Sequence, residues 1–243
     1  MAEQGQAFEL RGVHKAFGRQ VVLRDLSLTL EEGQFALLLG ANGSGKTTLL
    51  RLCAGLSRPD KGAVLFAGRA AGAATARNVG HGGHQLFLYG NLTVAENIEL
   101  FRGLAGSPLS VNDCLREWLL DPVRERRLCE LSKGMQFRVS LCRAFIGRPR
   151  FLFLDEPTSS LDEISTELFI EKTKNVVFGP GEAGFVLVAT HDVRRLRDCA
   201  NRILVLEGGI INKDLSALRR ERPDVPLEEL KDEVVNYYLA RNR

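Results

Sequence analysis

The sequence predicts an α/β fold built on a largely parallel sheet. Strand-like apolar runs alternate with helical patterns along most of the 243 residues, which is the order that parallel sheets require. The run over 35–39 is continuously apolar, as expected of a strand that is buried on both faces. This strand passes directly into a glycine-rich turn and a helix, so the first unit of the fold is visible in the sequence.

The composition is that of an ordinary globular protein, with 44% hydrophobic and 26% charged residues. A net charge of +3 is too small for a dedicated nucleic-acid binder, so no nucleic-acid partner is expected. No uncharged apolar run reaches the roughly 18 residues of a membrane span, and the N-terminus lacks the apolar core of a signal peptide. The five cysteines form no close pair, which favours reduced thiols. We therefore expect a cytoplasmic protein that acts at a membrane only through a partner.

The N-terminal part predicts an antiparallel β subdomain. Strand-like runs over 8–13 and 21–30 are separated by a turn at Gly18. A helix is expected over 46–54, because Gly55 closes it in the usual way.

The middle third predicts a helical insertion into the α/β order. Capping signatures at Thr93 and Ser110 begin two helices, and a third helix with one apolar face begins at Ser132. This third helix ends before Pro149, so we expect an inserted α-helical subdomain over about 86–147.

The parallel pattern then resumes and ends in a polar tail. Strands are expected over 151–154, 185–189 and 203–206, with a helix from about Glu163 between the first two. Residues 213–243 are expected to form a C-terminal helical tail that docks on its own domain or on a paired subunit.

A phosphate-binding loop follows the strand over 35–39. Its eight positions fit G-x-x-x-x-G-K-[ST] and are Gly40, Ala41, Asn42, Gly43, Ser44, Gly45, Lys46 and Thr47, with Thr48 next in the helix. The backbone amides and the helix N-terminus are expected to surround phosphate oxygens. Lys46 would contact the β- and γ-phosphates and the Thr47 hydroxyl would ligate Mg²⁺, so the chain is predicted to bind a nucleoside triphosphate.

Two acidic residues end the strand over 151–154. Asp155 lies at the carboxyl edge, beside the phosphate loop, where it can hold the water shell of Mg²⁺. Glu156 comes next and is expected to orient or deprotonate the attacking water, because phosphoanhydride hydrolysis needs positioning and one base.

A third motif heads the helix that begins at Ser132 and reads Leu131, Ser132, Lys133, Gly134, Met135 and Gln136. With the two preceding motifs in this order, the sequence resembles the ATP-binding cassette (ABC) transporter family, whose signature is LSGGQ. The resemblance covers residues 8 to about 212. It implies a RecA-like P-loop NTPase core with an antiparallel β subdomain and an inserted α-helical subdomain, within an ATPase domain over 1–212.

The resemblance also implies roles for individual residues. Phe17 matches the aromatic residue that stacks on adenine, and His191 matches the switch histidine that contacts the γ-phosphate as part of the catalytic set with Glu156 and Lys46. The D-loop corresponds to the segment that contains Ser160, Leu161 and Asp162.

The family's ATP site resembles a head-to-tail sandwich of two subunits. Ser132 and Gly134 would then donate backbone N–H groups to the γ-phosphate bound by the other subunit, next to Met135 and Gln136. One phosphate loop per chain therefore implies a homodimer or pairing with a second ABC ATPase. Lys133 and Met135 depart from the family signature, and Met135 stands where the family has glutamine.

The largest departure lies at the Q-loop, the segment whose glutamine normally contacts Mg²⁺ and the attacking water. The family glutamine aligns with His84, and Gln85 follows one place later. Either His84 fills this role or the loop shifts to present Gln85 to the nucleotide and the metal. The stretch Gly83-His84-Gln85 resembles the ATPases of the haem exporter used in cytochrome c maturation, and a generic exporter ATPase is the alternative.

We therefore predict an ATP-hydrolysing subunit that drives export through a separate transmembrane permease, from the cytoplasmic face of the inner membrane. A soluble ABC protein acting on nucleic acid or on ribosomes is the alternative class. Lys46 and Ser132 are too close in sequence for the long coiled coil of the DNA-acting relatives, and the chain has one cassette rather than two.

Overall fold

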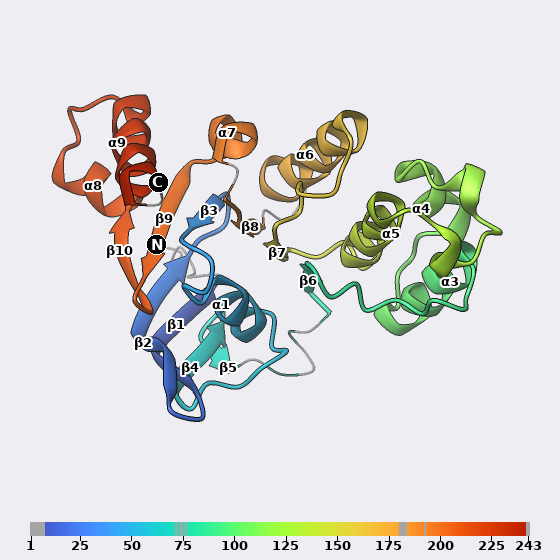
Figure 1. The fold of residues 1–243 in the computed structure, drawn as a ribbon, viewed down its shortest axis with the longest axis horizontal. Coiled ribbons are helices and arrows are strands. Elements are labelled where there is room, and N and C mark those ends of the chain that lie inside the picture. Colours follow the sequence, from blue (N-terminus) through green and yellow to red (C-terminus); the bar gives the residue numbers. More distant parts are fainter. Residues whose placement is uncertain are drawn as a thin grey trace, which may run out of the picture.

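The structure, a computed structural model, describes residues 8–70, 72, 75, 77–179, 184–191 and 193–241. Its larger sheet has the strand order β10-β9-β3-β8-β7-β6, and all its pairings are parallel except that of β10 with β9 (Figure 1). The bounds are β3 Phe35–Leu39, β6 Val79–Gly82, β7 Phe151–Asp155, β8 Phe185–Ala189, β9 Arg202–Glu207 and β10 Ile210–Asp214. The predicted α/β class with a largely parallel sheet is confirmed.

A second, antiparallel sheet with the order β2-β1-β4-β5 forms the expected N-terminal β subdomain. Its strands are β1 Phe8–Phe17, β2 Gln20–Leu30, β4 Lys61–Phe66 and β5 Arg69–Ala70. β1 runs past the predicted end at residue 13, and its register with β2 shifts between Leu10 and Val13 and again before Lys15. Such irregularities break the alternation of apolar residues on which the prediction depended.

The larger sheet is covered on both faces. Phe35, Leu37 and Leu39 of β3 belong to one apolar cluster and Ala36 and Leu38 to another, as the period of two requires. The first cluster includes residues from α6 Glu163–Phe178, α7 Val193–Leu196 and α9 Leu227–Arg241, whereas the second joins α1 Lys46–Cys53 and the antiparallel sheet. α1 stops one residue before the predicted end.

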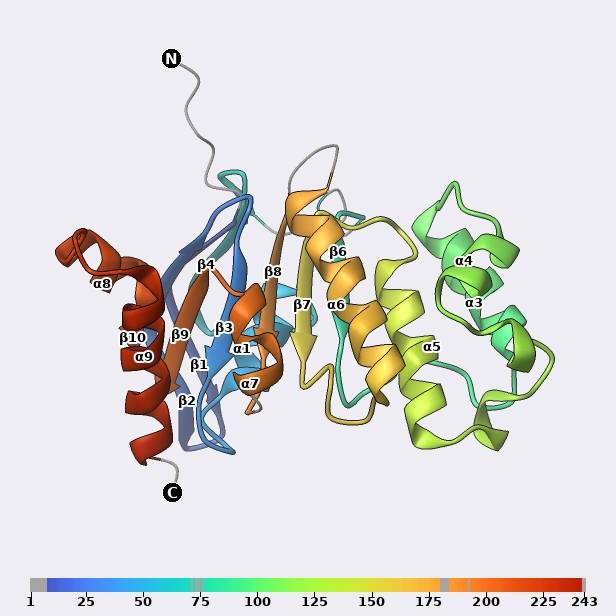
Figure 2. The same cartoon turned by 90° about the horizontal axis from the view of Figure 1, so that it is seen from above.

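The inserted helices lie beyond β6, at the end of the molecule opposite α9 (Figure 2). They are α3 Val94–Ala105, α4 Val111–Glu117 and α5 Lys133–Phe145, with short 3₁₀ turns at Asp121–Val123 and Leu128–Glu130. Thr93 caps α3 in a complete capping box, and Ser110 and Ser132 cap α4 and α5, so all three predicted helix starts are confirmed.

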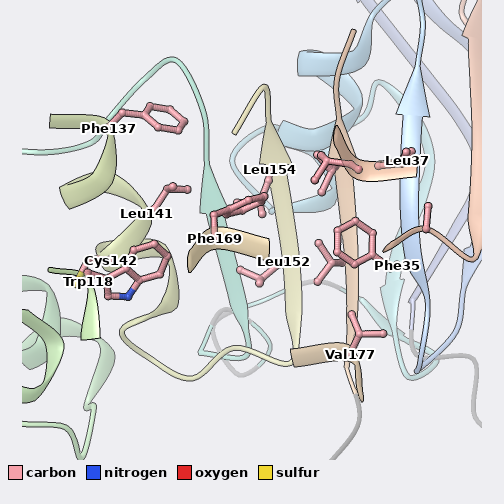
Figure 3. Packing of buried hydrophobic residues seen from close by; sticks show 14 of the residues in the cluster. Phe35, Leu37, Trp118, Phe137, Leu141, Cys142, Leu152, Leu154, Phe169 and Val177 are labelled. Carbon is pink, nitrogen blue, oxygen red and sulfur yellow. The ribbon is translucent and has the colours of Figure 1, made fainter. Parts of the chain in front are cut away.

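One apolar core continues from the sheet into the inserted helices. In Figure 3, Phe169 of α6 lies beside Leu152 and Leu154 of β7, on the side toward Leu141 of α5. Trp118, at the end of α4, extends this core, and its ring lies 5.1 Å from that of Phe145. The helical insertion is therefore anchored to the sheet through α5.

More of the C-terminal part forms helices and strands than the sequence predicted. The expected boundary at residue 212 falls inside β10, and α8 Leu215–Glu221 follows directly. The main helix of the predicted tail is α9, and its residues Leu230, Val234 and Tyr238 are buried against the core. The tail thus docks on its own domain, which was one of the two alternatives.

All five cysteines lie within the described residues and are free thiols. Cys53, Cys114 and Cys142 are buried and Cys199 is half-buried, whereas Cys129, beside α5, is exposed. None of the helices in the described part of the chain has the length and apolar character that crossing a membrane requires.

Candidate functional site

The phosphate loop occupies the turn between β3 and α1, at the carboxyl edge of the sheet. Gly45 immediately precedes α1 with a φ of 105°, a conformation that L side chains rarely adopt. A Cβ atom on Gly40 would lie 2.5 Å from Ser44 Oγ and 2.6 Å from the Leu206 carbonyl oxygen. The glycines are therefore required by backbone conformation at one end of the loop and by close packing against β9 at the other.

Lys46 is turned back onto this loop. Its Nζ donates hydrogen bonds to the carbonyl oxygens of Gly40 at 2.6 Å and Ala41 at 3.1 Å. Burial lowers the pKa of Lys46 below its usual value, and the carboxylates of Glu156 and Asp155 oppose this effect. The ammonium group is thus held inside the loop, where phosphate oxygens could replace the carbonyl partners.

Thr47 and Asp155 meet across the sheet edge. Thr47 Oγ1 donates a hydrogen bond of 2.6 Å to Asp155 Oδ2, and the carboxylate is buried. Asp155 is the last residue of β7, while Thr47 lies in the first turn of α1. Because the parallel strands all end at the same edge, residues 108 positions apart form one polar centre.

Glu156 and His191 form a second pair beside this centre. His191 Nδ1 lies 2.9 Å from Glu156 Oε2, and the same oxygen accepts the His191 N–H at 3.3 Å. The backbone N–H of Glu156 donates to the Ala189 carbonyl oxygen at 2.8 Å, which ties the residue to the end of β8. The carboxylate is nearly buried, whereas the histidine side chain is 62% exposed.

A pocket collects most of the predicted nucleotide residues. Its described lining is Phe17, Val22, Asn42, Gly43, Gly45, Lys46, Thr47, Thr48, His84, Asp155 and Glu156. Phe17 is 57% exposed at its rim, as an aromatic platform for a base would be. Val22, on β2, is the residue that the sequence prediction missed, since an apolar strand position carries no chemical signal.

The two Q-loop alternatives are placed differently. His84 lines the pocket, whereas Gln85 Oε1 accepts a hydrogen bond of 3.4 Å from Arg51 Nη2. The Gln85 side chain would therefore have to leave Arg51 to make its predicted contacts with the nucleotide and the metal, whereas His84 already lines the pocket.

The predicted signature residues lie apart from this pocket. Ser132 is exposed, and its Oγ accepts the Met135 N–H at 3.3 Å as the cap of α5. Gln136 Nε2 donates to the carbonyl oxygens of Leu128 and Leu131, both at 3.1 Å, so this side chain stabilises its own turn. Met135 packs against the core.

The predicted D-loop lies next to the signature within the same chain. A Cβ on Gly134 would approach the Ser160 carbonyl oxygen to 2.7 Å. Asp162 caps α6 by accepting the Ser165 N–H at 2.7 Å and pairs with Arg138 of α5 at 3.3 Å. Leu161, between them, packs against the core. The two motifs therefore form one surface.

Sequence reasoning missed an arrangement beneath the Q-loop. Arg143 of α5 donates to the His81 carbonyl oxygen at 2.5 Å, and its guanidinium lies 5.5 Å from the ring centre of Phe87 and 5.6 Å from that of Phe101. Burial lowers the pKa of His81 to about 4, although its Nδ1 lies 3.0 Å from the Phe153 carbonyl oxygen. No motif or spacing in the sequence indicates this arrangement.

Comparison with known proteins identifies the class of this fold and site. The family model described as "ABC transporter" matches residues 23–159, more than half of the chain. The chain is 36% identical to the aliphatic sulfonates import ATP-binding protein SsuB 2 of Pseudomonas aeruginosa, over 98% of this chain and 87% of the relative. It is 38% identical to the spermidine/putrescine import ATP-binding protein PotA of Methylococcus capsulatus, over 84% of this chain and 54% of the relative.

Solved structures share the fold. An ATP-binding subunit of an ABC transporter covers 94% of this chain with a TM-score of 0.80 at 24% identity, and 99% of that subunit is covered. The ATP-binding cassette MJ0796, solved as a dimer in a post-hydrolysis state with ADP and Pi, has a TM-score of 0.75 at 27% identity, over 85% of this chain and 97% of that one.

The chain therefore belongs to the ABC transporter family, as an ATP-binding subunit and an ATP hydrolase. The expected direction of transport finds no support, because these relatives are named as import proteins. The same names leave the predicted haem-exporter subgroup without support.

Proposed function

We propose that this chain hydrolyses ATP with Mg²⁺ in a dimer and thereby drives transport through a separate membrane subunit. The observation that carries the proposal is the convergence of Lys46, the Thr47–Asp155 pair and the Glu156–His191 pair on one sheet edge. Each element of phosphoryl-transfer chemistry has a candidate there: a cation, a metal-binding oxygen pair and a base.

The oxygen pair fits Mg²⁺. Thr47 Oγ1 and Asp155 Oδ2 lie 2.6 Å apart, and both residues line the pocket. Mg²⁺ is usually held by one or two protein oxygens together with phosphates and waters, so a larger cluster is not needed. When bound, the metal would supply charge neutralisation at the β- and γ-phosphates.

The remaining residues are assigned by their positions. Glu156 would accept the proton of the attacking water, and His191 would hold that carboxylate and contact the γ-phosphate. His84 would take the Q-loop role, since it lines the pocket in the present arrangement. Phe17 would stack on the base.

A dimer is proposed because the signature lies outside the pocket that holds the phosphate loop. Ser132 and Gly134 do not line this pocket, so within one chain they do not meet the bound triphosphate. A head-to-tail pair, either of two copies or with a second ABC ATPase, would bring the α5 N-terminus of one chain to the nucleotide of the other. MJ0796, a relative in fold, is described as a dimer.

The membrane partner is proposed to be a separate permease, with this chain bound peripherally at the cytoplasmic face of the inner membrane. The names of the relatives favour import. Export, with haem as cargo, is the second candidate, favoured by the stretch Gly83-His84-Gln85. Both candidates share the same ATP chemistry.

Co-purification and reconstitution test the proposal. The chain should be recovered with a multi-span membrane protein, and vesicles containing both should hydrolyse ATP faster than the chain alone. ATP-dependent uptake or release of labelled solute then gives the direction. A soluble complex in place of a membrane partner would refute the proposed transport role, and absence of ATP hydrolysis would contradict the assigned base.

A further inference from the structure

The phosphate loop borders a second hollow, separate from the nucleotide pocket. This hollow is lined by Ala41, Asn42, Gly43, Ser44, Leu206, Glu207, Gly208 and Arg241. Three segments far apart in sequence meet here: the phosphate loop, the end of β9 and the last residue of α9. Figure 2 shows α9 running along β9 toward this edge.

A carboxylate lies at this border. Glu207 is the last residue of β9, and its side chain is 21% exposed. β9 is packed directly against the loop, because the Leu206 carbonyl oxygen would lie 2.6 Å from a Cβ on Gly40. A negative charge beside a loop that binds a polyphosphate opposes binding, and this repulsion acts over several ångströms.

The groups around Glu207 offset its charge. Its Oε2 accepts hydrogen bonds from Asn212 Nδ2 at 2.7 Å and from Tyr237 OH at 3.1 Å, and Arg241 Nη1 lies 3.3 Å away. Arg241 also covers the Tyr237 ring at 4.7 Å, and Lys213 Nζ lies 5.2 Å from the same ring centre. Two of the three partners therefore belong to α9.

Docking of α9 does not depend on the contacts with Glu207, because its apolar side chains, the Tyr237 ring included, pack against the core. The helix is held by Leu230, Val234 and Tyr238, which are buried in the core, whereas the Arg241 side chain is 58% exposed. An exposed ion pair adds little to folding stability. Arg241 and the Tyr237 hydroxyl are thus more relevant to the charge of the phosphate-loop border than to the attachment of the helix.

We infer that Arg241 and Tyr237 are positioning residues for ATP binding, which set the nucleotide affinity of the phosphate loop by neutralising Glu207 at its border. This inference deepens the proposed function and rests on it, since it requires that the loop binds ATP. Through these residues, α9 becomes the element by which the C-terminal tail affects the ATP site.

A double-mutant cycle tests the inference, with the dissociation constant for ATP measured at low and at high ionic strength. Arg241→Ala should weaken ATP binding about three- to tenfold at low salt, because Glu207 is left uncompensated, and the effect should shrink at high salt. Tyr237→Phe should weaken binding about twofold, since the hydroxyl donor alone is lost. The double variant Arg241→Ala with Glu207→Gln should return to within about twofold of the parent protein.

Arg222→Ala is the matched control. Arg222 pairs with Glu233 on α9, so this variant also removes an exposed arginine from the tail but leaves the phosphate-loop border intact. Its ATP affinity should be that of the parent protein. Thermal unfolding of each variant separates a loss of affinity from a loss of folding.

Two results would overturn the inference: an Arg241→Ala variant that binds ATP as tightly as the parent at low salt, or a double variant that stays as weak as the single one. Failure of the parent protein itself to bind ATP would refute the proposed function instead. The two failures are therefore distinguishable in one experiment.

Discussion

Glu156 has a backbone conformation that few residues with side chains adopt. Its φ is 52°, in the left-handed region, which costs of the order of 1–3 kcal/mol unless the surroundings hold it. Here the hydrogen bond to Ala189 and the contact with His191 hold it. The conformation places the carboxylate at the sheet edge directly after Asp155, so two adjacent acids can serve two different roles.

Glu156→Gln should retain ATP binding and lose hydrolysis by at least about 100-fold, because the amide cannot accept a proton from water. The trapped nucleotide should also stabilise an ATP-bound dimer. Phosphate release and size-exclusion chromatography with ATP measure the two effects. Glu163→Gln, which changes an exposed acid in the first turn of α6, is the control and should behave as the parent protein. Normal turnover by the Glu156 variant would contradict its role as base.

His84 and Gln85 make a paired comparison at the Q-loop. His84→Ala should lower the turnover rate about tenfold, since this side chain lines the nucleotide pocket. Gln85→Ala should stay within about twofold, because Gln85 contacts Arg51 instead. Steady-state ATPase assays measure both variants. The opposite order of effects would show that the loop shifts to present Gln85.

The pKa of His81, lowered to about 4 by burial, predicts a stability change with pH. His81 binds a proton near pH 6.5 in the unfolded chain but only near pH 4 in the folded protein. Its neutral form therefore contributes fully to the free energy of unfolding above pH 6.5, and this contribution is lost as the pH falls toward 4. The loss is of the order of 3 kcal/mol. Denaturant unfolding between pH 7 and 4 should show that the free energy of unfolding of His81→Asn depends less steeply on pH than that of the parent protein. An unchanged slope would assign the pH dependence to other groups.

At the scale of the element, local signals predicted the helices better than the strands. The caps Thr93, Ser110 and Ser132 act through hydrogen bonds to residues three positions on, so a short window of sequence contains them. β6 Val79–Gly82 has two glycines among its four residues, and it is a strand because β7 pairs with it. That partner is about 70 positions away, so no local pattern reveals it.

Gly134 and Gly103 provide a matched pair of helix substitutions. Gly134→Ala should lower ATPase activity and stability, because the new Cβ would lie 2.7 Å from the Ser160 carbonyl oxygen and must displace the D-loop. Gly103→Ala meets no atom within 4 Å and should stabilise the protein by about 0.5–1 kcal/mol, the difference in helix propensity. Thermal unfolding and ATPase assays compare them. Equal stability and equal ATPase activity of the two variants would show that the D-loop tolerates displacement.

At the scale of the whole molecule, the sequence predicted which residues gather at the candidate site but not the contacts that support their segments. Lys46, Asp155 and Glu156 lie in motifs whose residue types follow from phosphate and metal chemistry, and the fold places them together. Arg143 contacts His81 and Phe87, and Arg241 contacts Glu207; these contacts depend on packing that no sequence spacing encodes.

Subunit complementation tests the head-to-tail dimer. Ser132→Arg should block the signature surface, and Lys46→Ala should disable the phosphate loop, so each variant alone should be inactive. Mixed dimers would contain one intact site, made of the loop from the first variant and the signature from the second. An equal mixture should therefore regain roughly a quarter of the parent ATPase activity by random pairing. No recovery, with both variants folded, would contradict a site shared between chains.

Cys129 makes the movement of the inserted helices directly observable. It is the exposed one of the five cysteines, it lies between α4 and α5, and the other four are partly or fully covered. A maleimide spin label or fluorophore should therefore attach to one position per chain without prior removal of thiols. In a symmetric dimer the two labels would report a single distance, and its change between the nucleotide-free and ATP-bound protein would measure how far the helical regions approach each other.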